Sequence, residues 1–559
     1  MITAVVAAIA ITQREARREK AAKEAEEAEA RKKSILVIGA GIAGLFAALL
    51  CRAQGFPVTV VDKKTQDELL EPEDGIVWLA VNALRVLEKV DEKLIPELRK
   101  NAAQTETLHY RRYKSGKSIA KTPLDSDLLA FQKPDLEYVL LSFLTATVKF
   151  STEILSYHDA PEDLDGPLPH GKPYALTASG EKLYADCIVS TEDLARTHVL
   201  ASAGEELAEI DTRWTTITGV ITTDSLPKNP LLISDRTDVW VGDEAYVSTL
   251  TSDEEMVFTV YDLDALNEGQ LPLEEIVEGW DSSLVSAVTH ESITTVSKRL
   301  TIRQKPTSIA SRKSRKLLLF GDAAFTFPPH SPHLECSYHA EAAATLAVCL
   351  RKAASVPLGL EVYSRMRNPR YAKAMMIAQE RFNTISGSSG EAELEASEIV
   401  WEIEKKEDEE GYWDYDADKF AEKNFDGVID LLTQELLGKQ KAMMEAAAKA
   451  QEEAERMAAE NAENAENAEN AENAENAENA ENAENAENAE NAENAENAEK
   501  GTTEDGEDEE QTKEDGEDEE KTKEDAEMAD ANEEKAGDSQ RGDGGSNAHI
   551  SEQNDTVHS

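Results

Sequence analysis

Residues 34–62 read SILVIGAGIAGLFAALLCRAQGFPVTVVD, and they decide the fold of this chain. The stretch opens with a short apolar run, Ser34–Ile38, of the kind that forms a fully buried parallel strand. Gly39, Gly41 and Gly44 follow with the spacing G-x-G-x-x-G. The residues after them predict a helix and then a second apolar strand, so the stretch as a whole predicts a strand–turn–helix–strand unit.

Each glycine of the motif has its own physical role. Gly39 permits the tight turn, Gly41 lets the backbone approach a pyrophosphate, and Gly44 lets the helix pack closely on the strand. A helix over residues 42–54 would direct its unpaired N–H groups and positive dipole end at that pyrophosphate. Asp62 closes the second strand, where a carboxylate accepts hydrogen bonds from ribose hydroxyls. We therefore expect a dinucleotide site; the alternative is a glycine-rich turn in an ordinary βαβ unit.

The chain of 559 residues is strongly acidic, with a formal net charge of −54. Residues 461–559 hold 35 Asp and Glu against 6 Lys and Arg, so the rest of the chain is acidic as well. Nucleic acids and anionic membranes need a cationic surface, and neither is expected as a partner. The four cysteines include no C-x-x-C pair. This indicates a reducing, cytoplasmic location with no disulfide framework and no zinc knuckle.

The first 33 residues are expected to be an extension outside the fold. Residues 1–12 are apolar but too few to span a bilayer, and no basic segment or convincing cleavage site marks a secretory signal. Residues 13–33 are mostly Ala, Glu, Lys and Arg with no apolar stripe, which predicts a solvated helix. A weak peripheral membrane anchor at residues 1–12 is the alternative to a loosely ordered extension.

The rest of the chain alternates apolar runs with turns. Residues 75–98 show apolar positions at helical spacing, and a later strand leads into a helix that starts near Pro134. Short β-branched runs in residues 214–303 predict a second, mostly antiparallel sheet. A buried strand within residues 316–329 precedes an Ala-rich helix expected at residues 338–352.

The chain ends in a low-complexity acidic tail. Thirteen consecutive Ala-Glu-Asn triplets run from Ala459 to Asn497. A period of three moves about 60° backward around an α-helix at each repeat, so no apolar face forms, and Glu residues at i and i+3 repel one another. We expect residues 459–559 to be disordered, with no partner assigned. A tail that binds basic proteins is the alternative.

Several landmarks occur in one order: the G-x-G-x-x-G motif, QKPDL at residues 132–136, the β-rich middle, GDAAFTFPP at residues 321–329 and YSRMRNPR at residues 363–370. In this combination the chain, from Ser34 to about Lys423, resembles the single-component FAD-dependent monooxygenases of the salicylate hydroxylase and para-hydroxybenzoate hydroxylase type. The resemblance implies an α/β fold, with a Rossmann-type FAD-binding domain, an inserted and mostly antiparallel β substrate domain, and C-terminal helices. The expected boundaries are 1–33 for the N-terminal extension, 34–205 and 304–385 for the FAD-binding domain, 206–303 for the substrate domain, 386–458 for an acidic helical segment and 459–559 for the tail.

Site residues follow from the resemblance, position by position. The GDAA motif would bind the ribityl end of the flavin, with Gly321 allowing close approach and Asp322 accepting from a hydroxyl. Lys133 stands where the family usually has Arg, so the charge is kept and the planar fork is lost. No catalytic residue is assigned, because the family has no universal acid or base. The expected cofactor-binding set is Gly39, Gly41, Gly44, Asp62, Lys133, Gly321, Asp322, Ala323 and Pro328.

The implied activity is a monooxygenase reaction with FAD as cofactor and NAD(P)H as co-substrate. No second G-x-G-x-x-G follows residue 62, which favours a plan in which the nicotinamide visits without its own Rossmann domain. The flavin supplies the chemistry: it takes electrons from NAD(P)H and delivers one oxygen atom of O2, which hydroxylates or epoxidises a small aromatic or polyketide-like molecule. The alternative is a degenerate flavin- or nucleotide-binding pseudoenzyme that acts as an interaction protein.

The flavin half of the motif set departs from the family pattern. Glu192 and Asp193 stand where the family has Asp-Gly, and Phe325 stands where a His is common. After the Pro-Pro pair the family has a G-x-G loop against the flavin, and here the run is HSPHLECSYH at residues 330–339. The lost glycines are expected to hinder movement of the flavin ring and access of the nicotinamide.

The same run raises the question of a metal site. His330, His333, Cys336 and His339 follow one another at intervals of three. On a helix these side chains would fan across about 180°, and Pro332 is expected to break the helix there, so they could not all face one ion. We therefore expect no metal.

Overall fold

The computed structural model describes residues 33–498, with gaps at 72–74, 104–106, 124–127, 145–146, 160–170, 227–231, 233–235, 243–244, 253, 264–271, 329–331 and 388–411. The chain falls into two units, up to Ala448 and from Lys449 onward. No helix within these described ranges is long and apolar enough to cross a bilayer. The expectations for residues 1–32, including a peripheral anchor, and for residues 499–559 lie outside the described residues.

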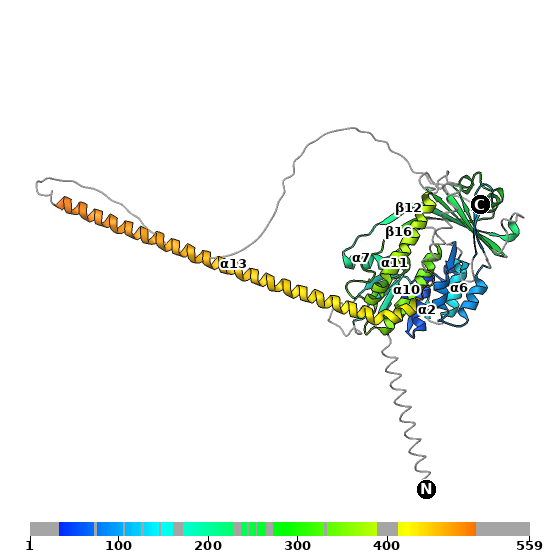
Figure 1. The fold of residues 1–559 in the computed structure, drawn as a ribbon, viewed down its shortest axis with the longest axis horizontal. Helices are drawn as coiled ribbons and strands as arrows, with labels where there is room; N and C mark the ends of the chain where they lie inside the picture. Colours follow the sequence, from blue (N-terminus) through cyan, green and yellow to red (C-terminus); the bar gives the residue numbers. More distant parts are fainter. Residues whose placement is uncertain are drawn as a thin grey trace, which may run out of the picture. The chain divides into compact units, whose positions relative to one another are not determined.

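A five-stranded parallel sheet forms the centre of the first unit (Figure 1). Its strands are β1 (Ile35–Ile38), β2 (Val58–Val61), β7 (Thr147–Lys149), β11 (Cys187–Ser190) and β17 (Leu317–Leu319), in the order β17-β11-β1-β2-β7. β1 and β11 are buried along their whole length, which explains their uninterrupted apolar sequences. Helix α2 (Ile42–Ala53) connects β1 to β2, so the predicted strand–turn–helix–strand unit is confirmed.

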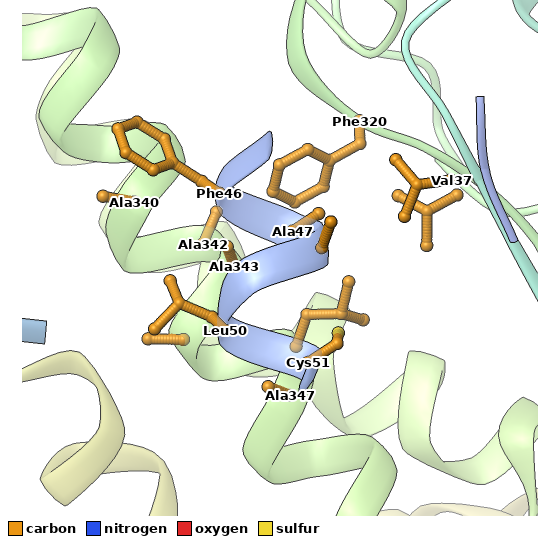
Figure 2. Packing of buried hydrophobic residues seen from close by; sticks show 14 of the residues in the cluster. Val37, Phe46, Ala47, Leu50, Cys51, Phe320, Ala340, Ala342, Ala343 and Ala347 are labelled. Atoms are coloured by element: carbon orange, nitrogen blue, oxygen red, sulfur yellow. The ribbon is translucent and has the colours of Figure 1, made fainter. Parts of the chain in front are cut away.

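Helix α2 packs against α10 (Pro332–Lys352) through small side chains, as Figure 2 shows. Phe46 and Leu50 of α2 lie beside Ala343 of α10, and all three are buried. The alanines of α10 let the two helix backbones approach closely. The helix that follows GDAA is therefore fixed against the helix that follows G-x-G-x-x-G. The expected helix break at Pro332 is wrong: proline is the first residue of α10, where its missing N–H removes no helical hydrogen bond.

A seven-stranded sheet forms the second layer of the first unit, in the order β16-β12-β15-β14-β13-β4-β5. Its strands are β4 (Thr107–Arg112), β5 (Ser118–Pro123), β12 (Glu209–Thr222), β13 (Arg236–Val241), β14 (Ala245–Thr251), β15 (Glu255–Leu263) and β16 (Thr295–Arg303). All its pairings are antiparallel except that of β13 with β4, which confirms the predicted second sheet. Helices α8 (Leu273–Ile276) and α9 (Ser282–Val288) contribute to its core.

Two smaller sheets and several helices complete the first unit. The sheets are β3 (Ile76–Leu79) with β6 (Leu129–Gln132), and β8 (Ile154–His158), β9 (Tyr174–Thr177) and β10 (Lys182–Tyr184). The helices are α3 (Gln66–Leu69), α4 (Val81–Leu87), α5 (Leu94–Asn101), α6 (Lys133–Phe143), α7 (Asp193–Ala203) and α11 (Val356–Gly387), with 3-10 turns η1 (Thr223–Ser225) and η3 (Gly321–Ala323). The helical reading of residues 75–98 is wrong at its start, because residues 76–79 pair with β6 as a strand.

The last described element is a long helix, α13 (Ala417–Ala498). Its first turns bury Phe425 and Leu432 in the core of the first unit. The structure differs here from the expected disorder, because the helix continues through the Ala-Glu-Asn triplets to Ala498. Ala and Glu have high helix propensity. The prediction of disorder considered only that the repeat has no apolar face to pack. Residues 433–489 are exposed throughout, consistent with a repeat that has no apolar face.

Candidate functional site

The glycine turn after β1 has the geometry that a pyrophosphate needs. Gly39 has φ +100°, and a Cβ there would lie 2.0 Å from Thr191 Oγ1. At Gly41, the first residue before α2, the nearest described atom to a Cβ is Glu137 Oε1 at 3.8 Å. The Cβ direction of Gly41 is therefore nearly open, and a side chain there would fill the space that a bound group could occupy.

Gly44 has the packing role expected from its place in the motif. A Cβ at Gly44 would lie 2.0 Å from the carbonyl oxygen of Gly39, so only glycine lets α2 lie this close to the turn. The first N–H groups of α2 consequently face the turn at short range. The turn and the helix N-terminus together can bind a pyrophosphate.

Asp62 lies directly beside this turn and is almost completely buried. Its Oδ2 accepts a hydrogen bond of 2.6 Å from the backbone N–H of Ala40, and its Oδ1 accepts one of 2.8 Å from that of Lys64. Each carboxylate oxygen keeps a second lone pair for a ribose hydroxyl. Asp62 thus fixes the turn and also fits the adenosine role assigned from the sequence.

The GDAA motif meets the first motif in space, although the two are far apart in sequence. Gly321 has φ +59°, and a Cβ there would lie 2.8 Å from the Cβ of Ala43 at the start of α2. Asp322 beside it is exposed, whereas Ala323 and Pro328 are buried. The structure therefore brings Gly39, Gly41, Gly44 and Gly321 to one edge of the parallel sheet, with an exposed carboxylate next to them.

Arg196 holds this second motif in place, and the sequence reading missed it. Its guanidinium donates to the carbonyl oxygens of Ala323 and Ala324, both at 3.0 Å, and to that of Gln304 at 2.8 Å. Arg196 is buried on α7. An arginine three residues after the altered Asp-Gly position was the available sequence signal, but its partners are more than 100 residues away in sequence.

The residues in place of the Asp-Gly pair have structural contacts of their own. The carboxylate of Asp193 lies 2.5 Å from Nη1 of Arg303, and the same guanidinium lies 2.6 Å from Glu209. Burial raises the pKa of Glu192, and the nearby Asp62 carboxylate raises it further. The altered motif thus links α7 to the edge of the large sheet.

Lys133 begins α6, as expected from QKPDL. Its ammonium lies 4.0 Å from the carboxylate of Glu137, which is fully buried. Glu137 is also the residue nearest the open side of Gly41. A cation at Lys133 therefore offsets a carboxylate that would otherwise repel a pyrophosphate at this turn.

Among the described residues, three side chains have the spacing of metal ligands. This group differs from the run of three histidines and one cysteine that the sequence analysis considered as a metal site, and shares only His339 with it. Ligand atoms of Asp322, Glu335 and His339 lie within 4.8 Å of one another. Burial lowers the pKa of His339 to about 4, so its imidazole is neutral at pH 7. Of the four residues weighed earlier, His330 lies outside the described residues and the side chain of His333 is not described. The expected absence of a metal stays a prediction.

The comparisons with known proteins agree with this geometry. A profile described as "NAD(P)-binding Rossmann-like domain" matches residues 37–66. The chain is 28% identical over 375 residues to asperlicin C monooxygenase of Petromyces alliaceus, covering 60% of this chain and 77% of that protein. It is 22% identical over 421 residues to the FAD-dependent monooxygenase okaB of Penicillium ochrochloron, covering 70% and 90%.

Solved structures show the same fold. CtdE in complex with FAD and a substrate matches with a TM-score of 0.59 at 16% identity, covering 72% of this chain and all of that one. A salicylate hydroxylase substrate complex matches with a TM-score of 0.55 at 16% identity, covering 70% and 97%. The chain is therefore similar in sequence to two monooxygenases, and it shares its fold with CtdE and with a salicylate hydroxylase.

Proposed function

We propose that the protein is an FAD-dependent monooxygenase that uses NAD(P)H and O2 to oxidise a small aromatic or polyketide-like molecule. The observation that carries this proposal is the meeting of the two motifs. Gly321 lies against Ala43, so the residues assigned to the pyrophosphate and those assigned to the ribityl chain share one sheet edge. The names of the two relatives, both monooxygenases, support the reaction class.

The residues present fit the adenosine and pyrophosphate half of FAD. The open side of Gly41 and the N–H groups of α2 would bind the pyrophosphate, and Asp62 would accept from a ribose hydroxyl. Asp322 would accept from a ribityl hydroxyl, while Arg196 keeps the loop that carries it in position. Once bound, the flavin supplies electron transfer and oxygen activation, and these residues hold it and exclude water.

The cofactor claim has a direct test in the full chain as purified. Its absorption spectrum should show the visible flavin bands, and the released flavin should be FAD by chromatography. With isotopically labelled O2 and NAD(P)H, a substrate should gain one labelled oxygen atom by mass spectrometry. A protein that takes up no flavin under any condition would overturn the proposal.

A second function, a flavin-binding interaction protein, is favoured by one observation. Asp193 is tied to Arg303 at the place where the family has a glycine, so the backbone there is less free to move. Stopped-flow bleaching of bound FAD by NADH or NADPH, with and without candidate phenols, separates the two functions. We expect slow reduction that a substrate accelerates; bound FAD that is never reduced would favour the interaction protein.

A further inference from the structure

Three side chains from two elements meet next to the GDAA motif. Asp322 lies in the 3-10 turn η3, and Glu335 and His339 lie four residues apart on α10. Residues at i and i+4 project from the same face of a helix, so Glu335 and His339 point in similar directions. One ligand atom from each of the three side chains lies within 4.8 Å of the other two. The fold thus gathers two carboxylates and an imidazole in one place.

This arrangement escapes the objection to a metal at the run from His330 to His339. Intervals of three residues make side chains fan around a helix, which excluded that set. An interval of four keeps Glu335 and His339 on one face, and Asp322 reaches them from a separate element. Only His339 belongs to both groups.

His339 is buried with a polar ring atom that lacks a partner. The residue is 5% exposed, and within the described part of the chain no hydrogen bond reaches its Nε2 atom. Buried polar atoms are nearly always hydrogen-bonded, so this one points to a ligand. Burial also lowers the pKa of His339 to about 4, so the ring is neutral at pH 7 and carries the lone pair that a metal ion needs.

Three aromatic side chains pack near this imidazole. The ring centres of Phe320, Phe325 and Tyr338 lie 6.2, 6.5 and 6.1 Å from that of His339. All three residues are buried. An apolar shell of this kind limits access of water and strengthens the attraction between a ligand and a cation. The imidazole therefore has little room to turn away from the two carboxylates.

Asp322 combines a fixed backbone with a side chain that can turn. Arg196 donates to the carbonyl oxygens of Ala323 and Ala324, which fixes the chain directly after Asp322. The side chain of Asp322 is exposed. Metal ions lie about 2.0–2.2 Å from nitrogen and oxygen ligands, so two ligand atoms of one ion are at most about 4.4 Å apart. Rotation of the Asp322 side chain can close the small remaining gap.

The charge of this group fits a divalent cation. Two ionised carboxylates carry two negative charges, and a neutral imidazole adds none. The charge of Arg367 reaches His339, but this arginine lies 3.1 Å from the carboxylate of Glu341. Lys133 also acts on this region, and its ammonium lies 4.0 Å from the carboxylate of Glu137. Both of these cations therefore already have a carboxylate partner.

The donor set favours a transition metal over Mg²⁺ or Ca²⁺. Imidazole nitrogen suits Zn²⁺, Fe²⁺ and Ni²⁺, whereas Mg²⁺ and Ca²⁺ prefer oxygen ligands alone. Three protein ligands leave one position of a tetrahedral shell for water, which is a common zinc arrangement.

We propose that Asp322, Glu335 and His339 bind one divalent transition-metal ion, such as Zn²⁺, in the flavin-free protein. Asp322 is also the residue assigned to a ribityl hydroxyl, so the metal ion and FAD exclude one another. This exclusion rests on the proposed function. Binding of the metal ion does not, because none of its three ligands depends on a flavin.

The metal site is tested by isothermal titration of the full chain with ZnCl2, after EDTA treatment and removal of any flavin. Excess MgCl2 in the buffer occupies the many other carboxylates of this acidic chain. We expect one Zn²⁺ per chain. Glu335→Gln and His339→Gln should each weaken its binding at least about tenfold, since even residues that only orient metal ligands matter by about 10–100-fold. No Zn²⁺ binding, or an unchanged affinity in Glu335→Gln, would overturn the site.

Glu361→Gln is the matched control for the lost carboxylate. Glu361 is exposed on α11 and pairs with Arg365 at i+4. This variant should bind Zn²⁺ as the original protein does. A loss equal to that of Glu335→Gln would show a general charge effect and would overturn the site.

The exclusion is tested by fluorescence titration with FAD in the same buffer. With Zn²⁺ at about ten times its own Kd, mutual exclusion raises the apparent Kd for FAD about elevenfold. Glu335→Gln, which keeps Asp322, should bind FAD equally well with and without Zn²⁺ at this concentration. An FAD affinity that Zn²⁺ leaves unchanged in the original protein would overturn the exclusion. A protein that binds Zn²⁺ here but never takes up flavin refutes the proposed function and leaves the metal site in place.

Discussion

The guanidinium of Arg370 donates two hydrogen bonds to the carboxylate of Glu341, one of 2.5 Å from Nη2 to Oε1 and one of 2.9 Å from Nε to Oε2. Glu341 is fully buried on α10, and Arg367 donates a further bond of 3.1 Å to Oε2. Arg370 also donates to the carbonyl of Tyr412, which lies just before α13. One buried carboxylate therefore joins α10, α11 and the chain that leads into α13, and it accounts for two of the three arginines in YSRMRNPR.

Removing the Glu341 carboxylate should destabilise the folded protein. Glu341→Ala leaves two buried arginines without their shared anion, and we expect a loss of about 3–5 kcal/mol in the free energy of unfolding. Urea unfolding monitored by circular dichroism measures this loss. Glu361→Ala is the control, because Glu361 pairs with Arg365 on the surface and should change stability by less than about 1 kcal/mol. Equal losses in the two variants would show that the buried network adds nothing specific.

Gly41→Val should abolish flavin uptake while the protein stays folded. Gly41 has φ −67°, which valine adopts without strain, and its Cβ direction is nearly open. The valine side chain would occupy the space assigned to the pyrophosphate. Uptake is measured by fluorescence titration with FAD and with FMN, and Gly427→Val on the exposed part of α13 is the control.

FMN should bind the original protein far more weakly than FAD, because it lacks the adenosine assigned to Asp62. Equal affinities would contradict the Rossmann assignment.

The local parts of the fold followed from sequence because each residue's role there depends on its near neighbours. The turn at Gly39 and the packing of Gly44 on it are set within six residues, and both were predicted correctly. The strand at residues 76–79 was misread because its partner, β6, lies some fifty residues later and its own apolar spacing resembles that of a helix. Pairing between distant segments leaves no mark within either segment.

The candidate site shows the same division. Gly321 and Asp322 were predicted through a motif, and the structure places Gly321 beside Ala43 of α2. The role of Arg196 was missed because it consists of hydrogen bonds to the backbone carbonyl groups of Ala323 and Gln304. Backbone carbonyl groups carry no sequence signature.

All four cysteines should be unreactive in the folded protein. They are buried, and burial raises the pKa of Cys187 and of Cys349 to about 12, so each remains a protonated thiol near neutral pH. Ellman's reagent at pH 8 should titrate almost no thiol in the native protein and four in denaturant. Met444→Cys, on the exposed surface of α13, is the positive control and should react at once. Fewer than four thiols in denaturant without reductant would show a disulfide.

Deleting residues 459–559 should leave the melting temperature and the flavin content unchanged. The last buried side chain of α13 is that of Leu432 among the described residues, and residues 433–489 of the helix are exposed. A segment that buries no apolar surface adds nothing to the core. Deletion from residue 417 is the opposing control, because it removes buried Ala421 and Phe425 and should lower the melting temperature by several degrees. A drop of that size for the shorter deletion would show that the tail docks.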